Sequence, residues 1–242
     1  MPYCFLEIAS LYKEAGYDDK ALNWAEHGWR AFTGTRADDR LREFLADTYH
    51  DRGRHKEAMT LIWDAFFDRP AVDSYQSLHR HAKRSGDWPA WRDKALACVR
   101  ERISAAARGR SSAKQPGNRM WPPSWSDRSV LVEILLWERK VEDAWREAKD
   151  GGCSTGLWLR LAEKREKPHP LDALAIYREY IQKLLEQTDN RAYQDAMTFI
   201  RKIHTLSASV EQMEAFRSFL TELRAVNRRK RNFIKLLDQE GW

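Results

Sequence analysis

The sequence is poor in cysteine and has no long apolar run. Only three of its 242 residues are cysteine, namely Cys4, Cys98 and Cys153. Three widely spaced cysteines argue against a disulfide framework and are typical of a reducing compartment. No apolar run approaches the 18 or more residues of a membrane-spanning helix, and the first residues lack the basic start and apolar block of a signal peptide. We therefore expect a cytoplasmic protein without a membrane partner.

The signatures of common catalytic and nucleotide-binding sites are also missing. There is no GxSxG, no GxxxxGK[ST], no HExxH and no GxGxxG. His79 and His81 are two residues apart, so on a helix their rings face different sides, and we expect them at the surface or at a helix end. His50 and His55 flank a turn and can meet, but no cysteine or carboxylate spacing completes a zinc site. We expect a non-enzymatic protein with no catalytic residue, cofactor or metal ligand, and three cysteines that are small buried residues.

Two N-terminal segments, 5–32 and 41–70, match each other at fixed spacing. In each segment, a tyrosine lies four residues before a glycine, and an alanine lies five residues after that glycine. A third, degenerate segment places its glycine 33 residues after the second one. The matched positions are Tyr12, Gly16 and Ala21 in the first segment, Tyr49, Gly53 and Ala58 in the second, and Gly86 in the third.

The second segment predicts a pair of helices that reverses at Gly53. Leu41, Leu45 and Tyr49 recur at four-residue steps and form an apolar stripe on the first helix. Gly53 can adopt the positive φ that ends a helix and turns the chain. Ala58 begins the stripe of the returning helix, which ends before a proline. Neither helix can bury its stripe alone, so neighbouring pairs must stack on it.

These spacings resemble the tetratricopeptide repeat, whose unit is about 34 residues. We therefore predict an all-α fold, an α-solenoid of helical hairpins resembling tetratricopeptide repeats. Its N-terminal hairpins occupy residues 1–103, and further hairpins continue the array over residues 126–242. Between them, residues 104–125 are rich in Ser, Gly, Pro and basic side chains and lack apolar periodicity, which predicts a long basic loop.

The formal charge is +6, from 42 Lys and Arg against 36 Asp and Glu, and the excess is concentrated in two segments, residues 100–128 and residues 191–242. Each segment is either ordinary solvated charge or a surface for phosphates or acidic proteins. The candidate partner-binding residues in and beside the basic loop are Arg108, Arg110, Lys114, Arg119, Trp121 and Trp125. Those near the C-terminus are Arg224, Arg228, Arg229, Lys230 and Arg231.

Several stretches resemble the C-terminal helical-repeat region of bacterial SWIM zinc-finger proteins, namely LREFLADTYHDRGRHKEAM, VEILLWERKVEDAWREAKDGGCS, EQTDNRAYQDAMTFIRKI and RKRNFIKLLD. The resemblance covers nearly all of Phe5 to Asp238 except the basic loop. Members of that family carry a C-x-C…C-x-H zinc module ahead of the repeats. This sequence contains neither C-x-C nor C-x-H, so the resemblance assigns no zinc ligand to any residue of this chain. An apolar helix stripe begins directly after Met1, so we expect either a repeat-only relative or a fragment of a longer protein.

The favoured function is a protein–protein interaction scaffold that binds a partner segment on a groove of the repeats. The eleven tryptophans supply both core packing and candidate aromatic anchors for that segment. Arg and Lys side chains would select acidic groups or a C-terminal carboxylate on the partner. The alternative is a nucleic-acid-associated accessory protein that grips the phosphate backbone through the two basic segments without reading sequence.

Overall fold

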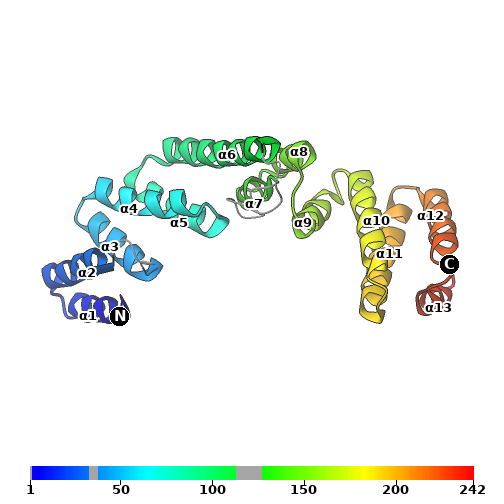
Figure 1. The fold of residues 1–242 in the computed structure, drawn as a ribbon, viewed down its shortest axis with the longest axis horizontal. Helices are drawn as coiled ribbons and strands as arrows, with labels where there is room; N and C mark the ends of the chain where they lie inside the picture. The colour runs from blue at the N-terminus through cyan, green and yellow to red at the C-terminus, as the bar shows by residue number, and fades with distance from the viewer. Residues whose placement is uncertain (1, 33–37, 113–126) are drawn as a thin grey trace. The chain divides into compact units, whose positions relative to one another are not determined.

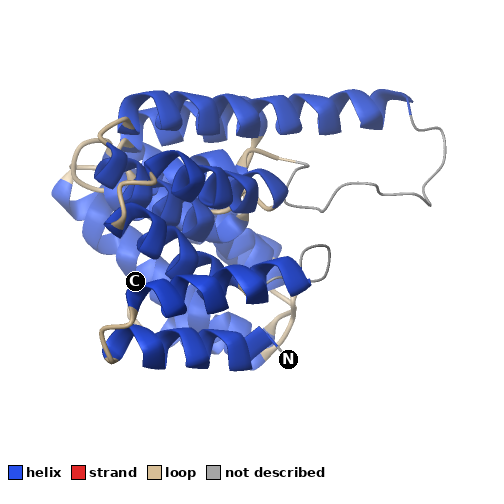
Figure 2. Cartoon of the chain, turned by 90° about the vertical axis from the view of Figure 1, so that its left-hand side faces the viewer, coloured by secondary structure: helices blue, strands red, loops and turns tan. Residues whose placement is uncertain are grey.

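The computed structural model describes the backbone of residues 2–32, 38–112 and 127–242, and the side chains of 4–32, 38–108 and 127–242. These residues form thirteen helices and no strand, so the predicted all-α fold of helical hairpins is confirmed (Figures 1 and 2). The chain divides into two units, Met1–Ser126 and Asp127–Trp242. None of the described helices is long and apolar enough to cross a bilayer.

The described part of the first unit forms six helices, each of which packs against helices one or two places away along the chain. The helices are α1 (Pro2–Glu14), α2 (Asp18–Phe32), α3 (Asp39–Asp51), α4 (His55–Asp68), α5 (Val72–Ser85) and α6 (Trp88–Ser112). Gly53 ends the α3 region with a φ of 73°, the left-handed conformation predicted for the turn between α3 and α4. The matched glycines Gly16 and Gly86 adopt the same conformation.

The predicted apolar stripes form the core of the first unit. Leu41 and Leu45 of α3 and Ala58 of α4 are fully buried, as is Ala21 at the matched position of α2. The small alanine side chains allow the paired helices to approach closely. Tyr49 is buried as well, and its hydroxyl donates a hydrogen bond to Glu26 of α2 at 3.0 Å. The periodicity of the sequence therefore identified the inward faces of α3 and α4.

The predicted loop at 104–125 starts too early. The backbone continues as α6 through Ser112, so residues 104–112 are helical rather than a loop. Alanine and arginine, which are frequent in this stretch, have high helix propensity, and Ala106 is buried. A helix can therefore continue here although its side chains lack a regular apolar stripe. The remainder of that prediction, residues 113–125, lies outside the described residues.

The second unit contains α7 (Ser129–Trp137), α8 (Val141–Gly151), α9 (Thr155–Arg165), α10 (Pro170–Glu186), α11 (Asn190–Ser209), α12 (Met213–Val226) and α13 (Arg231–Gln239). Its main core cluster extends from α9 to α13. Within this cluster, α11 contributes the most buried residues and α10 the next most. The buried residues of α10 are Ala173, Leu174, Tyr177, Ile181, Leu184 and Leu185. Pro170 at the first position of α10 has the fixed φ that suits a helix start.

Candidate functional site

A groove in the second unit is lined by side chains from three successive helices. It encloses about 310 Å³. One face of α10 forms its floor, because the lining residues of this helix recur at three- and four-residue spacing. The contributing residues are Trp145 and Lys149 of α8, Thr155, Trp158 and Leu159 of α9, and Asp172, Ala175, Ile176, Glu179, Tyr180 and Lys183 of α10.

The helix α10 therefore has two apolar faces with different surroundings. One face lies in the core, as described above. The other carries Ala175, Ile176 and Tyr180 and borders the groove. Ala175 is exposed, whereas Ile176 and Tyr180 are half-buried because they also pack against the edge of the core cluster. A helix that only covers a core needs one apolar stripe and a polar outer face. The second stripe leaves apolar surface that a ligand can bury.

Three aromatic rings line the groove, two from α8 and α9 and one from the α10 floor. Trp145 of α8 and Trp158 of α9 meet edge to face, with ring centres 5.5 Å apart and planes at 88°. Tyr180 on α10 meets Phe199 of α11 in a similar geometry, at 4.9 Å and 80°. All three groove aromatics are half-buried, so each keeps part of its surface open to the groove. Aromatic side chains of this kind commonly supply most of the energy of binding a partner segment.

Arg165, at the end of α9, is a buried cation that contacts two groove-lining residues, Asp172 and Trp145. It is only 4% exposed, although it carries a charge. Its guanidinium donates to Glu142 at 2.6 Å and to Asp172 at 2.7 Å, and its central carbon lies 4.5 Å from the ring centre of Trp145. The hydrogen bond from Arg165 lowers the pKa of Glu142. Arg165 therefore neutralises Asp172 and holds the Trp145 ring in place.

The other charges of the groove are less firmly held. Lys149 makes no ion pair with any described residue, and its Nζ lies 5.7 Å from the ring centre of Trp145. Lys183 pairs with Glu179 at 2.7 Å, but both side chains are at least half exposed. Such an exposed pair along a helix contributes only about 0.3–0.5 kcal/mol. Both ammonium groups are therefore available to a ligand.

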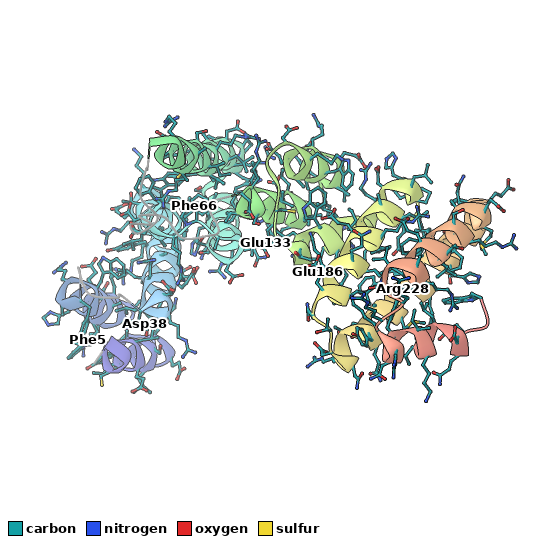
Figure 3. The ribbon with its side chains drawn as sticks, turned by 45° about the vertical axis from the view of Figure 1, so that its right-hand side comes forward. Phe5, Asp38, Phe66, Glu133, Glu186 and Arg228 are labelled. Carbon is teal, nitrogen blue, oxygen red and sulfur yellow. The ribbon has the colours of Figure 1, made fainter. Side chains whose placement is uncertain are left out.

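The predicted C-terminal basic residues lie elsewhere in this unit and do not line the groove. Arg224 pairs with Asp238, and Lys230 donates to the backbone oxygen of Leu185 at 2.7 Å, at the end of α10. These two cations are engaged within the unit. Arg228, labelled in Figure 3, and Arg229 lie in the turn between α12 and α13, and Arg231 begins α13. All three are exposed and form no ion pair with the described residues.

Of the predicted residues near the basic loop, only Arg108 has a described side chain. It is exposed on α6. The backbone of Arg110 belongs to the same helix, and its side chain lies outside the description. Lys114, Arg119, Trp121 and Trp125 also lie outside the described residues.

The histidines of the first unit form a cluster that the sequence only partly anticipated. His50 and His55 do meet, with their Nδ1 atoms 2.7 Å apart. His81 is fully buried, which corrects the expectation of a surface position, and its ring stacks on that of His50 at 5.1 Å. Its Nε2 lies 2.9 Å from Glu43. Within the described ranges, no group of three or more His, Cys, Asp or Glu has a geometry that could hold a metal.

The cysteines are less buried than expected. Cys4 is exposed, and Cys98 and Cys153 are only partly buried. Burial raises the pKa of the Cys153 thiol to about 12, and Asp127 adds to this effect. Burial likewise raises the pKa of Cys98. The expectation of three buried cysteines was therefore wrong for Cys4.

Comparison with known proteins found no family model and no curated protein that matches this chain.

The groove itself was not identified from the sequence. Trp145 and Trp158 could be recognised as helical tryptophans beside apolar neighbours, but not as partners of one another. One signal was present in the sequence of α10, where Ala175, Ile176 and Tyr180 follow a second stripe displaced from the core positions. A helix with two stripes indicates that a second surface contacts that helix.

Proposed function

We propose that this protein is a non-enzymatic protein–protein interaction scaffold that binds a segment of a partner in the groove of α8, α9 and α10. The main support is the apolar surface of Ala175, Ile176 and Tyr180 on α10, which lines the groove together with Trp145 and Trp158 and stays partly exposed. Pockets that bind ligands are typically apolar and aromatic, with a few polar groups that fix orientation. The tetratricopeptide-like spacing in the N-terminal half is consistent with this role, because stacked helical repeats commonly present such surfaces.

The experiment that tests this proposal selects peptides from a random library displayed on phage, using the full chain. The variant Ala175→Arg fills the groove, and the exposed position of Ala175 keeps the core unchanged. We expect enriched peptides that bind the native chain and lose at least tenfold in affinity for Ala175→Arg. The matched control is Ala225→Arg, at an exposed alanine of α12 that does not line the groove. Circular dichroism checks that both variants are folded.

Two results would contradict the proposal. One is a library that yields no peptide above background. The other is a set of peptides that bind native protein and Ala175→Arg equally well.

A second candidate function is binding of a nucleic-acid backbone through Arg228, Arg229 and Arg231. It is favoured by the lack of any described carboxylate partner for these three exposed guanidinium groups. Phosphate contacts of this kind release counterions, so affinity falls with salt by a log–log slope of about 0.9 per contact on duplex DNA. Arg224 and Lys230 contribute less in this case, because they already bind Asp238 and Leu185.

The test of this second function is binding to a generic DNA duplex over a range of salt concentrations. Replacing Arg228, Arg229 and Arg231 by Gln should lower the slope by up to about 3. Replacing the exposed Lys164, Lys167 and Arg217 by Gln is the control for lost charge. No binding at low salt, or an equal effect of both triple variants, would exclude this function.

A further inference from the structure

The charges of the groove are unevenly distributed along its length. Residues at the end of α9 and the beginning of α10 are adjacent, as the contact between Arg165 and Asp172 shows. Because α9 and α10 pack as a hairpin, Thr155 at the start of α9 lies toward the later part of α10, where Lys183 is found. Lys149 precedes Thr155 by only six residues and lines the same groove. Lys149 and Lys183 therefore both belong to the end of the groove at which α9 begins.

This end carries positive charge that the protein does not fully neutralise. Lys149 has no ion pair among the described side chains, and the pair between Lys183 and Glu179 is exposed. Ser154, which precedes α9, makes no side-chain hydrogen bond to the helix start, so the positive end of the α9 dipole also faces this region without a cap. At the opposite end, Arg165 already neutralises Asp172. A carboxylate is therefore favoured at the Lys149 end.

The remainder of the groove favours an apolar side chain. Trp158, Ile176 and Tyr180 present half-buried apolar surface between the two ends. The volume of about 310 Å³ is at the small end of the range of about 300–1,000 Å³ for ligand pockets. The floor from Asp172 to Lys183 is about 16 Å long at 1.5 Å per helical residue, which matches about five residues of extended chain. The dimensions fit a short segment and not a second helix.

We infer that the partner segment is a short acidic peptide with one bulky apolar side chain and a carboxylate one to three residues away. The apolar side chain packs against Trp158, Ile176 and Tyr180, and the carboxylate binds Lys149, with Lys183 as the second cation. This inference rests on the proposed function and specifies the chemistry of its partner. The apolar contact supplies most of the affinity, and the lysine contact supplies the preference for acidic over basic or neutral segments.

The peptide library described above tests this inference through composition. Among peptides that lose binding to Ala175→Arg, we expect Asp or Glu to be enriched within three residues of Leu, Ile, Phe or Trp. A repeat selection on Lys149→Glu should lose this enrichment. The control is Lys164→Glu, at an exposed lysine of α9 that does not line the groove, and the same acidic peptides should be recovered from it.

A direct measurement completes the test. One selected peptide, synthesised with blocked ends, is compared with its isostere in which Asn and Gln replace Asp and Glu, by calorimetry on the full chain. We expect the acidic peptide to bind at least tenfold more tightly at low salt, and the difference to shrink as salt is raised. Lys149→Glu should remove the difference, and Lys164→Glu should preserve it.

The outcomes separate this inference from the function on which it rests. Groove-dependent peptides without acidic enrichment, or a difference that survives Lys149→Glu, would overturn the acidic preference and leave the interaction scaffold intact. Absence of any groove-dependent peptide would overturn both.

Discussion

The Nδ1 atom of His50, near the end of α3, lies 2.7 Å from the Nδ1 atom of His55, at the start of α4. One ring must donate the proton and the other must accept it, so this hydrogen bond exists only while at least one of the two rings is neutral. His50 is buried against the ring of His81, and the charged groups near the stack are Glu43 and Asp47 of α3 and Arg80 and Arg84 of α5. Three helices of the first unit therefore meet around rings that can change charge.

This arrangement predicts that the first unit loses stability in mild acid. Burial, with the neighbouring charge of His81, lowers the pKa of His50 from 6.5 to about 4. The unfolded chain therefore takes up a proton at His50 before the folded chain does, so stability falls as pH drops below 6.5 and continues to fall until about pH 4. Between pH 7.5 and pH 5, the free energy of unfolding should decrease by about 2 kcal/mol. Hydrogen exchange of amides in α3, α4 and α5 measures this decrease.

The control for this prediction compares how steeply the free energy of unfolding changes with pH in each variant, and not its absolute value. His50→Gln should flatten the decline between pH 6.5 and pH 5, whereas His27→Gln, at an exposed histidine of α2, should leave it unchanged. An unchanged slope in His50→Gln would refute the assignment.

Gly28 of α2 should not tolerate a methyl group. A Cβ atom built there would lie 2.6 Å from Cβ of Phe5 and 3.2 Å from Cδ2 of Leu41. Gly28→Ala gains about 1 kcal/mol of helix propensity but forces α1 and α2 apart, and overpacking of this kind costs about 1–3 kcal/mol. We expect a net loss of up to about 2 kcal/mol in thermal or denaturant unfolding. Gly156→Ala in α9 meets nothing within 4 Å and should be neutral or stabilising by up to about 1 kcal/mol.

Arg165 should stabilise the second unit much more than the neighbouring surface arginines do. Arg165→Met keeps the apolar stem but leaves Glu142 and Asp172 without their shared partner. Because both carboxylates are partly exposed, water recovers some of the loss, and we expect a destabilisation of about 1–3 kcal/mol. Arg146→Met removes an exposed pair with Asp143 and should cost less than about 0.5 kcal/mol.

Two measurements check the role of Arg165. Thermal unfolding should separate Arg165→Met from Arg146→Met, and NMR titration should show the pKa of Glu142 rising toward its ordinary range in the first variant only. If the two substitutions lowered the free energy of unfolding equally, the buried ion pairs of Arg165 would stabilise the protein no more than an exposed pair does.

The three thiols should react with alkylating reagents at very different rates. Cys4 is exposed, whereas burial raises the pKa of Cys153 to about 12, so little thiolate exists there at pH 8. In variants that retain a single cysteine, Cys4 should be labelled at least about 100-fold faster than Cys153, with Cys98 between them. In guanidinium the three rates should converge. Comparable rates for Cys4 and Cys153 in the folded chain would contradict the described burial.

The features of the fold that could be predicted from sequence depend only on residues close together along the chain. The turn at Gly53 requires a positive φ that glycine adopts readily, and the sequence alone locates it. The stripe of Leu41 and Leu45 follows helical spacing, so it identifies an inward face without knowledge of its partner. The same pattern recurs around Gly16, and this repetition supports a series of helical hairpins more strongly than one segment alone does.

The remaining features depend on which helices meet. His81 is polar, and its buried Nε2 is satisfied because Glu43 of a neighbouring helix lies 2.9 Å away, with Arg80 at 3.3 Å. The end of α6 lies beyond the predicted start of the loop, because helix propensity and apolar periodicity indicate opposite structures for residues 104–112. Trp145, Trp158 and Ile176 come from three helices, and the spacing within any one helix does not show that they share a groove.

The core residues and the groove-lining residues of α10 share a single helical register. Leu174 is buried in the core, and Ile176, two residues later, lines the groove and packs against the edge of the core. Inserting or deleting one residue in this helix would rotate everything beyond it by about 100°, and both surfaces would be lost together. Relatives that acquire a different ligand preference should therefore keep the length of α10 constant and vary instead at Lys149, Thr155 and Trp158, whose helices contribute fewer residues to the interior.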